Sequence, residues 1–320
     1  MAQRVAQSTG VRSREVSLAE KFAAKKRAWS RHPEILRNRH TVYLGDARDL
    51  PLLVPDTTVH LIVTSPPYWN LKRYRDDLDG AQLGHLDDQT RFLDALGEVW
   101  RHCHQLLVPG GRLCVVVGDV CRSRKATGRH LVEPLHAYLQ VQCQEIGFDP
   151  LAPIIWSKIA NVATEMPANG SGFLGKPYEP NAIIKNDIEY VLVFRKPGEY
   201  RHPTQEQRDL SLISKEDYQT WFRQIWSDIP GDAQRKHPAV FPIEVPRRLI
   251  GMYSFVGDTV LDPFWGIGNT TIAAMLMHRS SIGVEIDPEY VDLGREHVGF
   301  PPEDSAIEFV VPHGKKGSRE

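Results

Sequence analysis

The sequence of 320 residues has few cysteines, no long apolar segment and almost no net charge. No two of its four cysteines form a CxxC pair, and none has a histidine at a zinc-binding spacing, so we expect free thiols and no metal site. No apolar run approaches the roughly 20 residues that cross a membrane, and the polar N-terminus lacks the apolar core of a signal peptide. These absences predict a cytoplasmic protein without a membrane anchor.

The net charge of −1 hides an uneven distribution along the chain. Residues 1–40 hold ten lysines and arginines against three glutamates, a net +7 that leaves −8 for the remainder. We therefore divide the chain into a basic N-terminal arm (1–40), a main domain (41–300) and a loose C-terminal tail (301–320). A basic arm either contacts phosphates or remains a solvated tail, and the sequence leaves both readings open.

Apolar runs and helical periods alternate along the main domain, which indicates an α/β fold. We expect seven strands, at 41–44, 59–64, 112–117, 151–156, 188–194, 259–261 and 281–285. Helical spacing predicts the longer helices at 92–107, 131–146, 243–255, 270–277 and 288–298. Two inserted segments interrupt the pattern, at about 158–187 and at 197–231, where we expect one short helix over 215–226. We interpret both inserts as loops that recognise a partner.

The first chemical motif is the stretch that ends the expected strand 59–64. Ser65, Pro66, Pro67 and Tyr68 combine a hydroxyl, a stiff backbone without two of its N–H donors, and an aromatic ring. Trp69 adds a second ring, which serves either as a stacking surface or as part of the core. Because ligands bind where the strands of an open α/β sheet end, we expect this stretch to hold a flat polar ligand.

The second motif joins the expected strand 259–261 to the next helix. Asp262, Phe264, Gly266, Gly268, Asn269 and Thr270 lie in this glycine-containing loop and at the start of the helix. Glycines let the backbone approach a ligand, and the helix N-terminus offers free N–H groups. Glu285 ends the following strand, where a carboxylate can accept hydrogen bonds from ribose hydroxyls. These features predict a nucleotide-like ligand.

Two ligands fit this second motif, a dinucleotide and S-adenosylmethionine. The third glycine of the dinucleotide fingerprint is missing, and Asp262 precedes the turn. A carboxylate at that place would repel a pyrophosphate, whereas it suits the ammonium and sulfonium groups of S-adenosylmethionine. We therefore favour S-adenosylmethionine.

Two basic segments are candidates for phosphate contact. Arg73 lies in a charged segment after the first motif, and Arg122, Arg124, Lys125 and Arg129 lie in the densest basic loop of the chain, which follows the strand 112–117. Such runs are usually solvated surface, but this loop starts at a strand end on the expected ligand side. We therefore predict that these five side chains, with Trp69, contact a nucleic acid.

With both motifs in view, the chain resembles the DNA amino-methyltransferases, which methylate exocyclic nitrogens, in the permuted arrangement called the β group. Ser65 to Tyr68 is similar to the family's catalytic motif, and Asp262 to Gly268 is similar to its cofactor motif. Asp46 follows Gly45 in a turn that resembles the one contacting the cofactor's adenine. Lys236, His237 and Pro238 begin a segment like the one that closes over the methionine end. The chain departs from the family pattern at Ile267 and Asn269, where serine and threonine are frequent.

The resemblance implies a Rossmann-like class I methyltransferase fold. Its sheet is mostly parallel, with one reversed strand near an edge and helices on both faces. It also implies that S-adenosylmethionine is the cofactor and double-stranded DNA the substrate. A restriction endonuclease that shares the site is an expected partner, and the chain would act as a monomer or a homodimer.

The exocyclic amine of a base is a poor nucleophile because its lone pair is delocalised into the ring. Ser65 Oγ and the carbonyl of Pro66 could accept its two hydrogens and aim the lone pair at the methyl group, while Tyr68 stacks on the flipped-out base. No cysteine nucleophile is needed. Phe264 is expected to pack on the cofactor or in the core.

Serine before Pro-Pro-Tyr favours cytosine N4 in this family, which makes a sequence-specific cytosine-N4 methyltransferase of a restriction-modification system our first hypothesis. Adenine N6 is the nearest alternative. A methyltransferase of RNA or of a protein amide, and a DNA-binding module with an inactive cofactor pocket, are the other hypotheses that the motifs allow.

Overall fold

The computed structural model describes residues 37–54, 58–69, 82–122, 124–158, 178–179, 183–184, 186–231, 241–299 and 305–311. Several predicted features lie outside these ranges: nearly all of the basic arm, Arg73, the segment Lys236 to Pro238, and most of the insert 158–187. In the described part of the chain, no helix is both long and apolar enough to span a bilayer.

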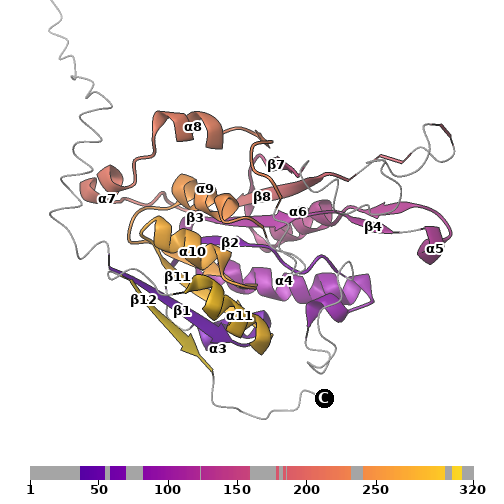
Figure 1. Ribbon diagram of the computed structural model, residues 1–320, viewed down its shortest axis with the longest axis horizontal. Coiled ribbons are helices and arrows are strands. Elements are labelled where there is room, and N and C mark those ends of the chain that lie inside the picture. The colour runs from indigo at the N-terminus through magenta and orange to yellow at the C-terminus, as the bar shows by residue number, and fades with distance from the viewer. Residues whose placement is uncertain are drawn as a thin grey trace, which may run out of the picture.

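A ten-stranded sheet organises the described residues (Figure 1). Its strands are β1 (Asn38–Leu44), β2 (Val59–Thr64), β3 (Leu107–Val117), β6 (Asp149–Pro150), β7 (Ile154–Ser157), β8 (Ile188–Arg195), β9 (Ile225–Trp226), β10 (Thr259–Asp262), β11 (Ser280–Glu285) and β12 (Ser305–Val310). Their order is β12-β1-β11-β10-β2-β3-β8-β7-β9, with β6 paired beside β8. β8 runs antiparallel to β3, β6 and β7, and the other pairings are parallel. The expected fold class, with one reversed strand, is confirmed.

The sheet has ten strands rather than the expected seven, because β6, β9 and β12 are additional. β6 and β9 have two residues each, too few for an apolar period to show. β12 lies in the tail that we expected to be loose, so that prediction was wrong for 305–310. It pairs in parallel with β1, and the ring of Phe309 meets the Trp265 ring edge-on at a centroid distance of 6.1 Å.

Helices cover both faces of the sheet (Figure 1). The described helices are α3 (Leu50–Leu53), α4 (Gln89–Leu106), α5 (Arg124–Thr127), α6 (Leu135–Ile146), α7 (Gln205–Leu210), α8 (Lys215–Trp221), α9 (Glu244–Tyr253), α10 (Asn269–Leu276) and α11 (Pro288–Val298), with two 3-10 helices, η1 (Ala47–Asp49) and η3 (Leu83–His85). α4 and α6 share one buried cluster with the sheet, whereas α9 and α10 share a second cluster on the opposite face. The two clusters form the core on either side of β2, β3 and β10.

The apolar spacing of α4 explains how it packs. Asp88 caps its N-terminus by accepting a hydrogen bond from the Arg91 amide at 2.8 Å. Phe92, Leu96 and Trp100 then follow at intervals of four residues and are fully buried against the sheet. α4 therefore packs against the face of the sheet that contains Ile62 of β2.

The segment after β3 differs from the expected loop and helix. β4 (Val120–Arg122) and β5 (Leu131–Glu133) form an antiparallel pair, with α5 between them. The pair projects from one end of the molecule in Figure 1. The expected helix 131–146 starts only at Leu135, because the first three residues of the predicted range belong to β5.

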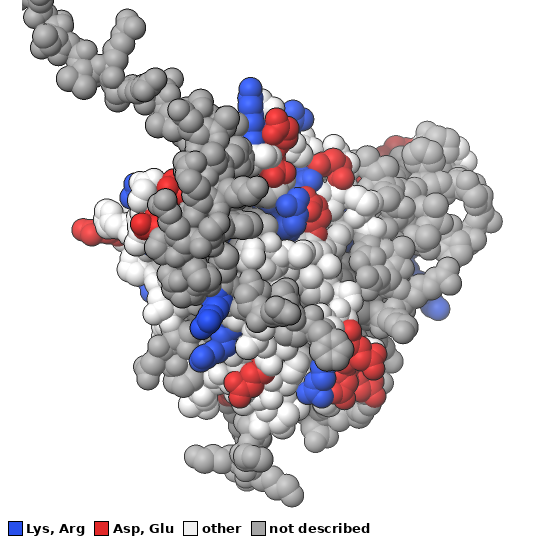
Figure 2. Space-filling model, turned by 60° about the vertical axis from the view of Figure 1, so that its left-hand side comes forward, with Lys and Arg blue, Asp and Glu red and all other residues white. Residues whose placement is uncertain are grey.

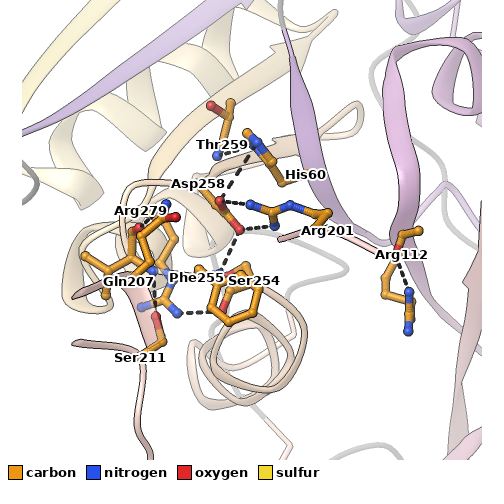
Figure 3. Close-up of polar contacts among 12 residues, drawn as sticks. His60, Arg112, Arg201, Gln207, Ser211, Ser254, Phe255, Asp258, Thr259 and Arg279 are labelled. Carbon is orange, nitrogen blue, oxygen red and sulfur yellow. Dashed lines mark hydrogen bonds and ion pairs between the residues drawn. The ribbon is translucent and has the colours of Figure 1, made fainter. Parts of the chain in front are cut away.

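The insert 197–231 is part of the folded domain rather than a free recognition loop. Leu210, Trp221 and Trp226 are buried, and Trp226 belongs to β9 rather than to the expected helix. Arg201 forms an ion pair with Asp258, which precedes β10 at the amino edge of the parallel strands (Figure 3). Where described residues show on the face that Figure 2 brings forward, acidic and basic side chains are interspersed. The insert is therefore anchored to the domain, and its role in recognising a partner stays a prediction.

Candidate active site

A pocket lies at the carboxyl edge of the sheet, where four neighbouring strands end. Residues at or just after the ends of β1, β2, β10 and β11 line this pocket. Its volume is about 850 Å³, including the part that is open to solvent. Its lining residues include Asp46, Ser65, Pro67, Asp262, Phe264, Gly266, Asn269 and Glu285. The fold thus brings residues of both predicted motifs together, although they are separated by about 200 positions in the chain.

One hydrogen bond joins the ends of the two strands that lead into the motifs. Thr64, the last residue of β2, donates from Oγ1 to Asp262 Oδ1 at 2.7 Å. β2 and β10 are neighbouring parallel strands, so their final residues lie side by side. This contact fixes the position of Ser65 relative to the glycine loop. From the sequence we assigned Thr64 no role beyond ending the strand, since nothing in a one-dimensional pattern links it to Asp262.

A chain of hydroxyl groups runs through the predicted catalytic motif. Ser65 Oγ lies 3.1 Å from the Tyr68 hydroxyl, which lies 3.5 Å from the carbonyl oxygen of Val116. With Tyr68 donating to that carbonyl, Ser65 can donate its own proton to Tyr68. The lone pairs of Ser65 Oγ then remain available as acceptors for another donor group.

Asp262 is buried at the end of β10, and its hydrogen-bond donors among the described residues are all neutral. The hydroxyls of Thr64 and Thr270 each donate to it at 2.7 Å, and the amide of Phe264 donates at 3.1 Å. Burial raises the pKa of Asp262 to about 6, although these hydrogen bonds act in the opposite direction. A positively charged ligand group would therefore be favoured beside it.

Glu285 has a similar environment at the end of β11. Its carboxylate accepts from the amide of Gly266 at 2.8 Å and from that of Asp287 at 3.0 Å. Burial raises the pKa of Glu285 to about 7. Gly266 has a positive φ of 58°, which brings its amide to Glu285 and ties the glycine loop to the neighbouring strand end.

Asp46 caps the short helix that follows β1. Its carboxylate accepts from the backbone amide of Arg48 at 2.8 Å and is paired with the Arg48 guanidinium. Among the described groups, the three lining carboxylates therefore differ, since Asp46 has a cationic partner while the donors to Asp262 and Glu285 are neutral.

Packing against Trp265 requires a glycine at position 268. It has a φ of 89°, and a Cβ atom there would lie 2.7 Å from the ring of Trp265. Gly283 and Gly294 face the same ring, where Cβ atoms would approach to 2.2 and 2.4 Å. The indole N–H donates to Thr271 Oγ1 at 2.8 Å. Trp265 is thus held in a cradle of three glycines, which fixes the loop and which spacing alone did not reveal.

Asn269, one of the two departures from the family pattern, connects three elements. Its Nδ2 donates to the carbonyl oxygen of Phe241 at 2.7 Å, and its Oδ1 accepts from His297 Nε2 at 2.8 Å. Phe241 lines the pocket and precedes α9. The side chain of Asn269 therefore anchors the segment that follows residues 232–240 to α10 and α11.

Among the described residues that we predicted to contact DNA, none lines the pocket. Trp69 is 5% exposed, its Nε1 donates to the carbonyl oxygen of Leu86 at 2.7 Å, and the Arg122 guanidinium lies 4.8 Å from its ring centroid. The prediction of Trp69 as a stacking surface for DNA was therefore wrong, because burial in the α4 cluster removes its ring from contact. Arg124, Lys125 and Arg129 are exposed on the projecting β4–α5–β5 segment.

Among the described residues, no cysteine lines the pocket. Cys103, Cys114 and Cys143 are buried, and burial raises the pKa of each thiol. Within the ranges that the structure describes, no cluster of His, Cys, Asp and Glu could hold a metal ion. The chemistry of the pocket therefore rests on hydroxyls, carboxylates and aromatic rings.

Comparison with known proteins decides the family. A family model described as DNA methylase, of the N6 and N4 type, matches residues 59–296. The chain belongs to this DNA methylase family. The type II methyltransferase M.MjaI of Methanocaldococcus jannaschii is 35% identical over 313 residues, which cover 88% of this chain and 98% of the relative. The type II methyltransferase M.MthZI of Methanothermobacter thermautotrophicus is 34% identical over 280 residues, 81% of this chain and 76% of the relative.

Solved structures agree with this assignment. A proposed DNA modification methylase from Thermus thermophilus, crystallised in complex with S-adenosyl-L-methionine, has 47% identity and a TM-score of 0.69, covering 86% of this chain and 100% of that one. The PvuII DNA methyltransferase, described as cytosine-N4-specific, has 20% identity and a TM-score of 0.53, covering 80% and 86%, and shows the likeness of fold alone. The resemblance inferred from the two motifs is confirmed.

Proposed function

We propose that this DNA methylase transfers a methyl group from S-adenosylmethionine to the exocyclic N4 of a cytosine flipped out of duplex DNA. The observation that carries the proposal is the hydrogen bond between Thr64 and Asp262, which joins the residue just before the Ser65–Tyr68 motif to the cofactor motif. A base held at Ser65 and a cofactor held beside Asp262 and Glu285 would then be neighbours.

The pocket has the polar and aromatic side chains that S-adenosylmethionine needs. Bound there, the cofactor would supply a methyl group on a positively charged sulfur. The negative charge of Asp262 is compensated only in part by its neutral donors, so it favours the cationic end of a ligand. Glu285 and Asp46 offer carboxylate acceptors at neighbouring strand ends. Phe264 lines the same pocket and packs edge-on against Trp100. The relative crystallised with S-adenosyl-L-methionine supports this choice.

The chain's own residues would prepare the target amine. Ser65 Oγ, with its proton directed to Tyr68, accepts one amine hydrogen, and the Pro66 carbonyl accepts the other. These two contacts draw the nitrogen lone pair out of conjugation and aim it at the methyl group. The ring of Tyr68 supports the base by stacking. The excess proton of the methylated amine leaves to solvent.

We choose cytosine N4 over adenine N6 because Ser65 stands at the head of the motif, where serine favours cytosine in this family. The chemistry points the same way, since a hydroxyl is a weaker acceptor than a carboxylate and cytosine has the more polarised amine. The wider proposal also assigns the cofactor role to Lys236–Pro238 and phosphate contacts to Arg73, Arg122, Arg124, Lys125 and Arg129. A restriction endonuclease with the same recognition sequence would be the functional partner.

The direct test expresses the protein in cells that lack DNA methylation, digests the DNA to nucleosides and identifies the product by mass. N4-methylcytosine is expected, and N6-methyladenine alone would show that the second candidate is right. Methylation-aware sequencing of the same DNA gives the recognition sequence. A Ser65→Ala variant serves as the control for background methylation.

A further inference from the structure

An ion pair lies beside the catalytic motif and is not part of either predicted motif. Lys158, which follows β7, donates to the carboxylate of Glu189, near the start of β8. Because β8 is reversed, its first residues lie at the edge where the parallel strands end. The pair therefore lies at the ligand edge of the sheet.

Gly118 brings this ion pair next to Tyr68. β3 ends at Val117, which pairs with Tyr190, so Gly118 lies beside Glu189. A Cβ atom on Gly118 would lie 3.3 Å from Tyr68 Cε2 and 3.3 Å from Glu189 Cγ. The ring that would carry the base and the carboxylate that holds Lys158 thus border the same small space, which a larger residue than glycine would fill.

Lys158 is held in place by contacts of both its side chain and its backbone. Its Nζ lies 4.8 Å from the ring centroid of Trp156, which is fully buried, and the backbone amide of Lys158 donates to the Asp187 carbonyl at 2.9 Å. The Lys158 side chain is 24% exposed, so it is not sealed inside the protein. An ammonium has three N–H donors, and Glu189 does not require all of them.

The polar edge of the base determines which donors its pocket must supply. With its amine at Ser65, a cytosine still has two acceptors, N3 and O2, whereas adenine has the ring nitrogen N1 and a C–H group in place of the carbonyl. A base acceptor that leaves water without a new donor loses free energy. A cationic donor beside O2 would therefore favour cytosine.

We propose that Lys158, oriented by Glu189, donates a hydrogen bond to O2 of a cytosine stacked on Tyr68 and so selects cytosine over adenine. The inference rests on the proposed transfer to cytosine N4. In this arrangement Glu189 is a positioning residue, since it acts through Lys158 and does not contact the reacting atoms.

The test uses duplex oligonucleotides with the recognition sequence and either cytosine or 2-thiocytosine at the target position, because sulfur accepts hydrogen bonds more weakly than oxygen. We expect wild-type kcat/KM to be about tenfold or more lower for 2-thiocytosine. Lys158→Met should lower kcat/KM for cytosine by about 10- to 100-fold and bring the ratio of the two substrates close to one. Lys158→Arg, which keeps a cationic donor, should retain most of the discrimination.

Lys215→Met, the same change on the exposed start of α8, is the matched control and should leave both rates unchanged. Equal wild-type rates on the two bases would overturn the inference without any variant, and so would an unchanged ratio in Lys158→Met. The mass of the methylated nucleoside distinguishes a failure of the Lys158 proposal from a failure of the proposed function. A cytosine product without discrimination refutes the role of Lys158 alone, whereas an adenine product refutes the proposed function as well.

Discussion

Two buried aspartates at opposite ends of β10 have different partners. Asp262 ends the strand at the carboxyl edge and is held by two threonine hydroxyls and a backbone amide. Asp258 precedes the strand at the amino edge and is held by both terminal nitrogens of Arg201 at 2.5 Å and by the Phe255 amide at 2.7 Å (Figure 3). The two residues are 2% and 1% exposed, so burial alone does not distinguish them.

The difference lies in charge compensation. The negative charge of Asp258 is neutralised by a guanidinium, with His60 Nε2 lying 3.9 Å from the carboxylate, so Asp258 has a structural partner and fastens the 197–231 insert. Asp262 has neutral donors among the described groups, and its charge is left for a ligand to compensate. A buried carboxylate with neutral partners at a strand end is therefore the better indicator of a functional site.

The largest expected difference between the carboxyl and amino edges of the sheet is in kcat, after substitution of one serine at each edge. Ser65→Ala removes the acceptor of the target amine and should lower kcat about 100-fold or more, while the dissociation constant for S-adenosylmethionine changes little. The matched change at the amino edge is Ser211→Ala, whose hydroxyl accepts from the Val256 amide at 2.8 Å. It should cost about 1 kcal/mol of stability and leave kcat unchanged. Single-turnover kinetics and calorimetry measure the two quantities, and normal turnover by Ser65→Ala would contradict the assigned role.

The second effect concerns stability at the amino edge. Asp258→Asn leaves the Arg201 guanidinium without its buried charge partner and should lower the free energy of unfolding by about 3 kcal/mol. Cofactor affinity should stay within about twofold of wild type at temperatures where the variant is folded. Urea unfolding and calorimetry test both expectations. A loss of cofactor affinity larger than the loss of folded protein would mean that the edges are not independent.

The third effect is the converse change at the carboxyl edge. Asp262→Asn keeps the shape of the side chain but removes its charge. Its amide oxygen still accepts from one of the two threonine hydroxyls, and its amide nitrogen donates to the other. Affinity for S-adenosylmethionine should fall about 10- to 100-fold, because the cationic end of the cofactor loses its counter-charge. The free energy of unfolding of the ligand-free protein should change by less than it does in Asp258→Asn. Unchanged cofactor affinity would remove the functional distinction between the two aspartates.

The sequence was most informative where one residue type has a strict local role. Pro66 and Pro67 end a strand, and the order Asp262, Gly266, Gly268 marks a strand, turn and helix, so the family and both halves of the pocket followed from motifs. The strands that cross the centre of the sheet were also predicted, because their apolar runs are long enough to show a period.

The contacts that hold the site together could not be predicted from the sequence. Thr64 and Asp262 meet because β2 and β10 are neighbours, and the glycine cradle around Trp265 uses residues from three elements. Such contacts depend on tertiary packing, which a local period does not encode. Trp69 was misjudged for the same reason, since its burial depends on how α4 and Arg122 pack around it.

The smallest expected effect is on the pH dependence of stability, and it isolates Asp262. Its pKa is about 6 in the folded protein against an ordinary value of 3.8, so the folded state binds the proton more tightly than the unfolded state. The stability that this group contributes is therefore greatest below about pH 4 and is lost as pH rises through about 6. Between about pH 5 and 7 the ligand-free wild type should lose about 1 kcal/mol relative to Asp262→Asn. Urea unfolding across this range measures the difference, and Ser211→Ala should run parallel to wild type. If Asp262→Asn also ran parallel, the carboxylate would not be the uncompensated charge that sets the carboxyl edge apart from the amino edge.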